Sequence, residues 1–146
     1  MFPFSGKVLS IPDGDGLLLS VSGTPVKVRL YGCDAPEWGQ PYARQSWLRL
    51  STCVGTQPVL CYPMAADKYG RIVCDCYGLN KCSISLLLVL HGFAWYYRDY
   101  APQAQELRDA QRMARFYRRG LWRESNPVPP WIFRHSGKRG AVKHVV

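Results

Sequence analysis

The sequence has no hydrophobic run long enough to cross a membrane. Its longest apolar stretch, Ile84–Leu90, is interrupted by Ser85, whereas a membrane-spanning helix needs about 20 apolar residues. The N-terminal residues also lack a basic segment followed by an apolar one, which excludes a signal peptide within this chain. No internal repeat or second domain is evident. We therefore expect a protein without a membrane partner.

Acidic residues are scarce, because ten Asp and Glu face 19 Lys and Arg and leave a net charge of +9. This excess favours polyanionic partners, nucleic acid first and anionic membranes second, with a merely soluble basic protein as the alternative. A hydrophobic content of 47% excludes a mainly disordered chain. The length of 146 residues suits one domain with one core, and we expect a monomer.

Cysteine is abundant for so short a chain, at six residues. An even number predicts disulfides and an oxidising compartment, with free thiols in a reducing cytosol as the alternative. We therefore expect an exported protein, periplasmic or secreted, whose signal peptide is absent from this chain; a cytoplasmic protein is the alternative. A zinc site at Cys74, Cys76 and Cys82 fits poorly, because structural zinc usually takes four ligands at wider spacings.

Periodic apolar residues predict the secondary structure. Alternation predicts five strands, over residues 6–11, 17–21, 26–31, 56–62 and 70–77. Helical spacing predicts three helices, over residues 41–52, 84–91 and 103–119, the second capped by Ser83. Residues 127–131 are expected to be extended, and residues 135–146 to form a basic, flexible tail after a domain that covers residues 1–134. These elements predict an α+β fold, a five-stranded OB-type barrel with three helices.

The segment Val28–Glu37 combines a strand, a turn and three charges. Arg29 lies between apolar residues of the third strand, and Asp34 and Glu37 follow where Gly32 breaks it. Two carboxylates and a guanidinium are costly to bury unpaired, so they predict either a functional site or a surface salt bridge.

Two further charged motifs lie on either side of this segment in the sequence. Asp13-Gly14-Asp15 precedes it, and Asp67-Lys68-Tyr69-Gly70-Arg71 follows it. Each motif is weak alone, but in this order and spacing the chain resembles the thermonuclease (staphylococcal nuclease-like) family. The resemblance covers roughly residues 5 to 134 and continues through Gly92–Trp95, Gly120–Trp122 and Pro130–Trp131. It implies the same OB-type fold and a calcium-dependent endonuclease that cleaves DNA and RNA and leaves 3′-phosphates.

Calcium is the cofactor that the resemblance implies. Asp15 and Asp34 would be its carboxylate ligands, the main-chain carbonyl of Ala35 a further ligand, and Asp13 an acid behind them. Carboxylate and carbonyl oxygens are the hard donors that calcium prefers, and waters can complete the shell.

Three residues are candidates for catalysis. Glu37 would take a proton from the attacking water or orient that water; the structural alternative is a charge near the start of the helix that follows. Arg29 and Arg71 would clamp the phosphate, because a guanidinium donates to two oxygens where negative charge develops. The alternatives are a pairing of Arg29 with Asp34 alone and a structural role for Arg71 at a strand edge.

Tyr97, Tyr100 and Lys68 are candidates for nucleotide contacts, through stacking, a hydroxyl or charge. The chain departs from well-known family members at two positions. Arg98 stands where their nucleotide pocket has a tyrosine, and Gly16 stands where Thr or Ser often follows the Asp-Gly-Asp motif. These departures put one nucleotide contact and one hydroxyl near the metal in doubt.

Two functions remain open from the sequence. The first is a nuclease with little sequence preference, since charge and stacking carry no code for base edges. The second is a non-catalytic OB-fold module that binds nucleic acid. The presence of all five metal and catalytic side chains counts against the second, namely Asp15, Arg29, Asp34, Glu37 and Arg71.

Overall fold

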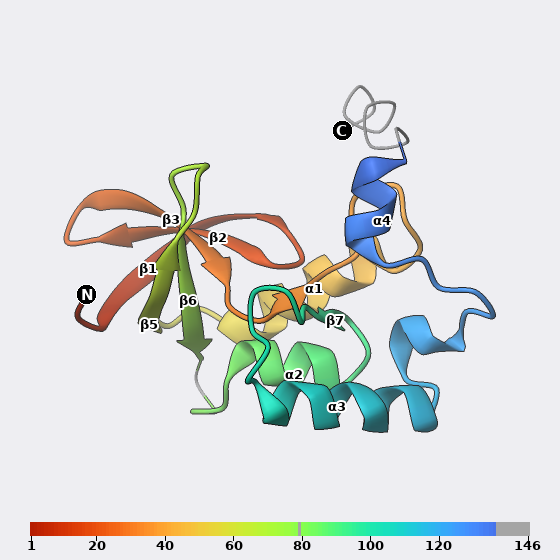
Figure 1. The fold of residues 1–146 in the computed structure, drawn as a ribbon. Helices are drawn as coiled ribbons and strands as arrows, with labels where there is room; N and C mark the ends of the chain where they lie inside the picture. The colour runs from red at the N-terminus through yellow and green to blue at the C-terminus, as the bar shows by residue number, and fades with distance from the viewer. Residues whose placement is uncertain (79, 137–146) are drawn as a thin grey trace.

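A closed barrel of five strands dominates the computed structural model, which describes residues 1–78 and 80–136 (Figure 1). The strands follow the order β1-β2-β3-β6-β5 around the barrel. Their bounds are β1 (Phe4–Asp13), β2 (Gly16–Val21), β3 (Thr24–Leu30), β5 (Val59–Ala66) and β6 (Ile72–Tyr77). β3 and β6 pair in parallel, and every other neighbouring pair is antiparallel. The predicted α+β barrel is confirmed.

Alternation along β2 and β3 fills the barrel. Leu17 and Leu19 of β2 and Val28 and Leu30 of β3 are buried, because residues two apart in a strand share one face. Arg29, between the last two, therefore points to the other face, toward the rim where the candidate site lies.

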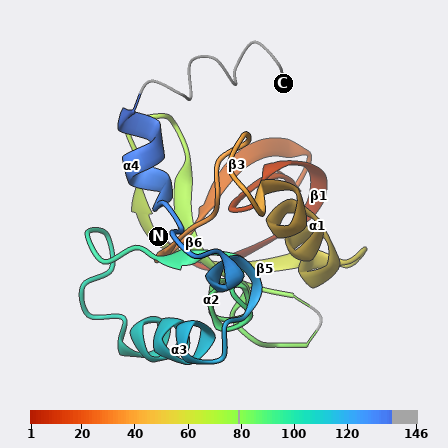
Figure 2. The ribbon, with the colours of Figure 1, turned by 90° about the vertical axis from the view of Figure 1, so that its right-hand side faces the viewer.

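Helices cover one side of the barrel (Figures 1 and 2). Their bounds are α1 (Ala43–Val54), α2 (Ile84–Leu90), α3 (Gln105–Phe116), a 3-10 helix η1 (Gly120–Arg123) and α4 (Pro130–His135). Ser83 caps α2 by accepting from the backbone N–H of Leu86, as predicted. Because α2 is apolar nearly all round, it is buried between β6, α1 and α3.

The short helix α4 corrects the expectation of an extended segment over residues 127–131. Pro129 is extended, but Pro130 is the first residue of the helix, a position where its missing N–H costs nothing. The described helices thus number four, with the 3-10 helix in addition, rather than three. Of the predicted tail 135–146, the structure describes residues 135 and 136 alone, and the rest lies outside the described residues.

A two-stranded sheet links the barrel to the helices. It consists of β4 (Cys33–Asp34) and β7 (Trp95–Tyr96), which pair antiparallel with Asp34 opposite Trp95. This pairing brings the carboxylate of the central motif close to the segment that carries the candidate tyrosines. Within the described residues, no helix is long and apolar enough to span a membrane.

All six cysteines are free thiols in the structure, so the expected disulfides are not found. Cys61 and Cys76 face each other on β5 and β6 with their sulfurs 3.8 Å apart, and Cys74 is also buried. Cys82 is exposed and does not join them. The buried thiols pack as small hydrophobic side chains in the core.

Candidate active site

Gly14 brings the loop between β1 and β2 against the segment that follows β4. A Cβ at Gly14 would lie 2.8 Å from the Cβ of Ala35 and 2.9 Å from the Cβ of Ser46, so a side chain at this position would push the two segments apart. Across this contact, Oδ2 of Asp15 accepts a hydrogen bond of 2.8 Å from the backbone N–H of Ala35. Asp15 and Asp34, the predicted metal ligands, therefore lie on adjacent segments at one end of the barrel.

Asp34 is the most deeply buried carboxylate of the site, with 1% of its surface exposed. Its Oδ1 accepts from Arg29 at 3.2 Å and from Arg134 at 2.9 Å, and its Oδ2 accepts from Arg134 at 2.7 Å. Arg134 also lies 3.5 Å from Oε1 of Glu37. One guanidinium from α4 thus joins the predicted metal ligand Asp34 to the predicted base Glu37.

Arg29 is held beneath the carboxylates rather than free at the surface. It donates to the carbonyl oxygen of Cys33 at 2.9 Å and lies 3.4 Å from Oδ2 of Asp15, in addition to its bond with Asp34. Burial alone would lower the pKa of Arg29, but the charges of Asp15 and Asp34 more than offset this and raise it. The alternative of pairing with Asp34 alone is wrong, since Arg29 serves both aspartates.

The site holds more negative than positive charge. Burial, and then the charge of Asp15, raises the pKa of Asp13 to about 7. Burial also raises the pKa of Asp34 to about 6, although the bond from Arg134 works against it. The four carboxylates exceed the two guanidiniums by two charges when all are ionised; the carboxylates are those of Asp13, Asp15, Asp34 and Glu37.

This imbalance equals the charge of one divalent cation, and the donors suit calcium. In the described part of the chain, no three His, Cys, Asp or Glu side chains form a ready metal-binding group, so two carboxylates would need a carbonyl and waters beside them. A carboxylate offers about four lone-pair sites, and Asp34 uses both on Oδ1 and one on Oδ2. Asp34 therefore keeps one acceptor site on Oδ2, and the residues present fit the ion.

Gly16 lies directly beside Asp13, the carboxylate next to the proposed calcium ligands. A Cβ at Gly16 would approach Oδ1 of Asp13 to 3.0 Å and the ring of Pro12 to 3.3 Å. The same Oδ1 accepts from the backbone N–H of Asp15 at 3.2 Å. A Thr or Ser at this position would therefore press on the Asp13 carboxylate.

Glu37 is positioned through Gln40. The side-chain oxygen of Gln40 accepts from the backbone N–H of Glu37 at 2.9 Å, and its nitrogen donates to the carbonyl of Val128 at 2.8 Å. One side chain thus fixes the loop of Glu37 to the segment that leads into α4. Because α1 begins at Ala43, Glu37 lies outside the first turn of that helix, and its alternative role as a charge near the helix start is left untested.

Arg71 and Lys68 lie in the turn between β5 and β6. Arg71 forms a 2.6 Å ion pair with Asp67, whose other oxygen accepts from the backbone N–H groups of Tyr69 and Arg71. The Arg71 side chain remains about a third exposed, and the exposed Lys68 lies over the ring of Tyr69. Asp67 thus holds Arg71 within its own turn, and its role as a phosphate clamp stays a prediction.

The predicted nucleotide-binding tyrosines lie together. Tyr100 is 72% exposed and meets the ring of Tyr97 edge-on at 4.7 Å. On its other side, Tyr97 stacks on Trp131 with 5.2 Å between ring centroids and 3° between planes. Burial raises the pKa of Tyr97, and so does the charge of Asp34, which places this aromatic group beside the carboxylates.

Arg134 is a site residue that the sequence analysis missed, as is Gln40. Arg134 follows Trp131 by three residues in α4, so the two side chains are neighbours on the helix surface. The sequence signal that could have indicated this helix was Pro130, which can start a helix, followed by the aromatic Trp131 and the basic Arg134 one turn apart.

Comparison with known proteins agrees with this geometry. The sequence model of the family described as "Staphylococcal nuclease homologue" matches residues 27–124. A protein named "Uncharacterized endonuclease" from Escherichia coli is 36% identical over 130 residues, which cover 89% of this chain and 84% of that protein.

Two further relatives carry nuclease names. A "Micrococcal nuclease" from Shigella flexneri is 32% identical over 144 residues, covering 92% of this chain and 83% of that protein. A "Probable staphylococcal-like nuclease CAN2" from Oryza sativa subsp. japonica is 33% identical over 128 residues, covering 88% of this chain and 33% of that protein. The motifs at the barrel rim, the five-stranded barrel and these matches together show that the chain belongs to the staphylococcal nuclease family.

Proposed function

We propose that this protein is a calcium-dependent nuclease that hydrolyses phosphodiester bonds of DNA and RNA at the rim of its barrel. Family membership supports a nuclease. The observation that carries the finer proposal is the gathering of four carboxylates, those of Asp13, Asp15, Asp34 and Glu37, around two guanidiniums, with an excess of two negative charges that one divalent cation would balance. Cleavage within a strand, with a 3′-phosphate product, follows the family resemblance.

The proposed calcium ligands are the carboxylates of Asp15 and Asp34 and the main-chain carbonyl of Ala35. When bound, calcium would draw a phosphate oxygen to the site and offset its charge. Burial disfavours the ionised form of Asp34 despite Arg134 and Arg29, and a divalent cation beside this carboxylate would favour that form.

The chain's own residues would carry the proton and the phosphate. Glu37, fixed through its backbone by Gln40, would accept a proton from the attacking water or hold that water in line. Arg29 would stabilise the charge that develops on the phosphate, as would Arg71 after exchanging Asp67 for the substrate. Such donors are typically worth a few kcal/mol each, as in oxyanion sites.

Low sequence preference follows from the same arrangement. The proposed substrate contacts are the rings of Tyr97 and Tyr100 and the charge of Lys68, and stacking and charge act alike on every base. The proposal is therefore a general nuclease rather than a reader of one sequence.

Digestion of plasmid and single-stranded DNA tests the site. Glu37→Gln removes the proton acceptor with little change in shape, and Arg71→Ala removes one proposed donor, so each should lower the rate at least about a hundredfold in calcium. Lys27→Ala, an exposed charge on β3, is the matched control and should leave the rate within about twofold. Full activity in Glu37→Gln would refute the proposed base; DNA that is bound but never cut by the wild type would favour the non-catalytic module.

A further inference from the structure

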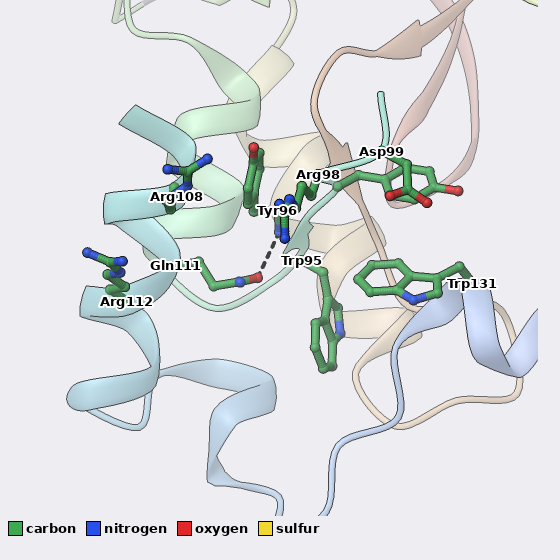
Figure 3. Close-up of a pocket in the computed structure, with 9 residues that line it drawn as sticks. Trp95, Tyr96, Arg98, Asp99, Arg108, Gln111, Arg112 and Trp131 are labelled. Carbon is green, nitrogen blue, oxygen red and sulfur yellow. Dashed lines mark hydrogen bonds between the residues drawn. The ribbon is translucent and has the colours of Figure 1, made fainter. Parts of the chain in front are cut away.

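A pocket of about 590 Å³ opens beside the candidate site, between β7, the middle of α3 and α4 (Figure 3). This volume is in the range of pockets that hold small ligands. Of the residues proposed above, Tyr97 lines it, whereas none of the proposed metal ligands or catalytic residues does. The other lining residues have no role in the proposed cleavage site.

One side of the pocket is aromatic. Trp95 from β7 and Trp131 from α4 line it, and their indole rings meet edge-on at 5.5 Å. Both rings are only partly buried, so each keeps surface that a flat ligand can cover. Exposed aromatic surface of this kind is what proteins use to stack nucleic-acid bases.

The opposite side is basic. Arg108 and Arg112, one turn apart on α3, line it across from Trp131, and Arg98 also lines it (Figure 3). Arg108 is held by the carbonyl of Pro102 at 3.1 Å, whereas the exposed Arg112 has no hydrogen bond or ion pair to another described residue. One acidic residue, Asp99, offsets part of this charge. The balance favours an anionic ligand.

Helix α4 connects the pocket to the candidate site. Trp131 faces the pocket, and Arg134, one turn later, binds Asp34. Tyr97 lies between them, stacked on Trp131. A nucleic-acid strand bound at the candidate site would thus pass the aromatic side of the pocket.

From these contacts we infer that the pocket holds a nucleotide of the substrate strand next to the bond that is cut, its base against Trp95 and Trp131 and its phosphate against Arg108 and Arg112. The inference rests on the proposed nuclease function and adds a subsite to it. A base can reach the indole rings only when it is unpaired, so the subsite selects single-stranded or locally opened nucleic acid.

Binding of a fluorescent thymidine oligonucleotide of about 12 nucleotides tests the subsite apart from cleavage. Fluorescence anisotropy measures the affinity, and a calcium chelator in the buffer prevents cleavage. The double variant Arg108→Ala/Arg112→Ala should weaken binding about tenfold. The slope of log affinity against log salt concentration should fall by the amount expected for about two phosphate contacts. Alanine favours helices, so α3 should persist, as circular dichroism can check. Lys7→Ala/Lys27→Ala removes the same charge from exposed positions on β1 and β3 and should weaken binding less than about threefold.

The base is tested with an oligonucleotide of equal length that carries abasic sugars. The wild type should prefer the base-bearing strand by about tenfold, Trp131→Phe should keep that preference, and Trp131→Ala should lose it. Equal weakening by the arginine and lysine pairs, or an equal affinity of the wild type for both strands, would overturn the subsite.

Cleavage in calcium separates the two proposals. If the wild type cuts but the arginine and lysine pairs behave alike in binding, the nuclease stands and the subsite falls. If the wild type never cuts but the binding pattern appears, the subsite stands and the catalytic proposal falls. With both proposals correct, Trp131→Ala raises the KM for the base-bearing oligonucleotide and leaves the KM for the abasic oligonucleotide within about twofold.

Discussion

Arg134 lies one hundred residues after Asp34 in the sequence, yet its guanidinium donates to both oxygens of that buried carboxylate, at 2.9 and 2.7 Å. It also falls outside residues 27–124, the part of the chain that the family model matches. The last described helix therefore completes a site whose four carboxylates and Arg29 lie near the start of the chain. This relationship makes α4 part of the site rather than a terminal appendage.

Removal of Arg134 should destabilise the fold as well as alter the site. In Arg134→Ala, Asp34 keeps Arg29 as its one charged partner among the described residues, and the loss of a bidentate bond to a buried carboxylate costs about 2 kcal/mol. We expect that loss in urea unfolding without calcium, with Arg134→Lys intermediate. Arg44→Ala, at an exposed position on α1, is the control. A change below about 0.5 kcal/mol in Arg134→Ala would show that the ion pair contributes nothing.

Asp13 predicts a distinct pH dependence of stability. Its pKa is about 7 in the folded protein against 3.8 ordinarily, so folding takes up a proton between these values. The stabilisation from this group is present below the unfolded pKa and is lost as the pH rises through about 7.

Asp13→Asn should therefore raise the melting temperature at pH about 8 by roughly 5 °C in calcium-free buffer, and by less at pH about 5. Asparagine keeps the oxygen that accepts from the backbone N–H of Asp15. Thermal unfolding followed by circular dichroism measures the difference. A lower melting temperature at pH about 8 would contradict the raised pKa.

Gln40 should matter for catalysis more than for stability. Its two bonds fix the backbone of Glu37 and the segment before α4, so Gln40→Ala should lower kcat/KM for single-stranded DNA about tenfold by misplacing the base. Gln45→Ala removes an exposed glutamine on α1 and serves as the control. Equal activity of the two variants would mean that the loop of Glu37 keeps its position without this bridge.

Thiol titration tests the state of the cysteines. In the folded protein the exposed Cys82 should react first and the half-buried Cys53 more slowly. The buried thiols should react only on unfolding, and burial raises the pKa of Cys33 to about 12, which keeps it protonated. Unfolding without reductant should then release six thiols. A smaller number would restore the disulfide hypothesis.

The sequence predicts the barrel well because its signals are local. Alternation along β2 and β3 and the cap at Ser83 depend on residues a few positions apart, and the structure confirms both. The site carboxylates were predicted from short motifs. In the first motif the glycine is required sterically, because Gly14 packs against Ala35. A pattern of this kind can be found without knowing the fold.

Other features depend on contacts that no local pattern encodes. The pairing of Arg134 with Asp34 spans one hundred residues, and α4 is too short, and too close to Pro127 and Pro129, for a helical period to show. The number of cysteines does not say whether they pair, and the buried thiols are accommodated simply as small core side chains. Long-range ion pairs and thiol states therefore have to come from the structure.

The most direct test of the account is the rate at which the wild type cleaves single-stranded DNA as calcium is titrated, beside Asp15→Asn. We predict saturable activation that a chelator abolishes and added calcium restores, with Asp15→Asn needing at least about tenfold more calcium because one ligand charge is lost. Cleavage that persists in chelator, or an unchanged calcium requirement in Asp15→Asn, would contradict the assignment of the carboxylates at the barrel rim.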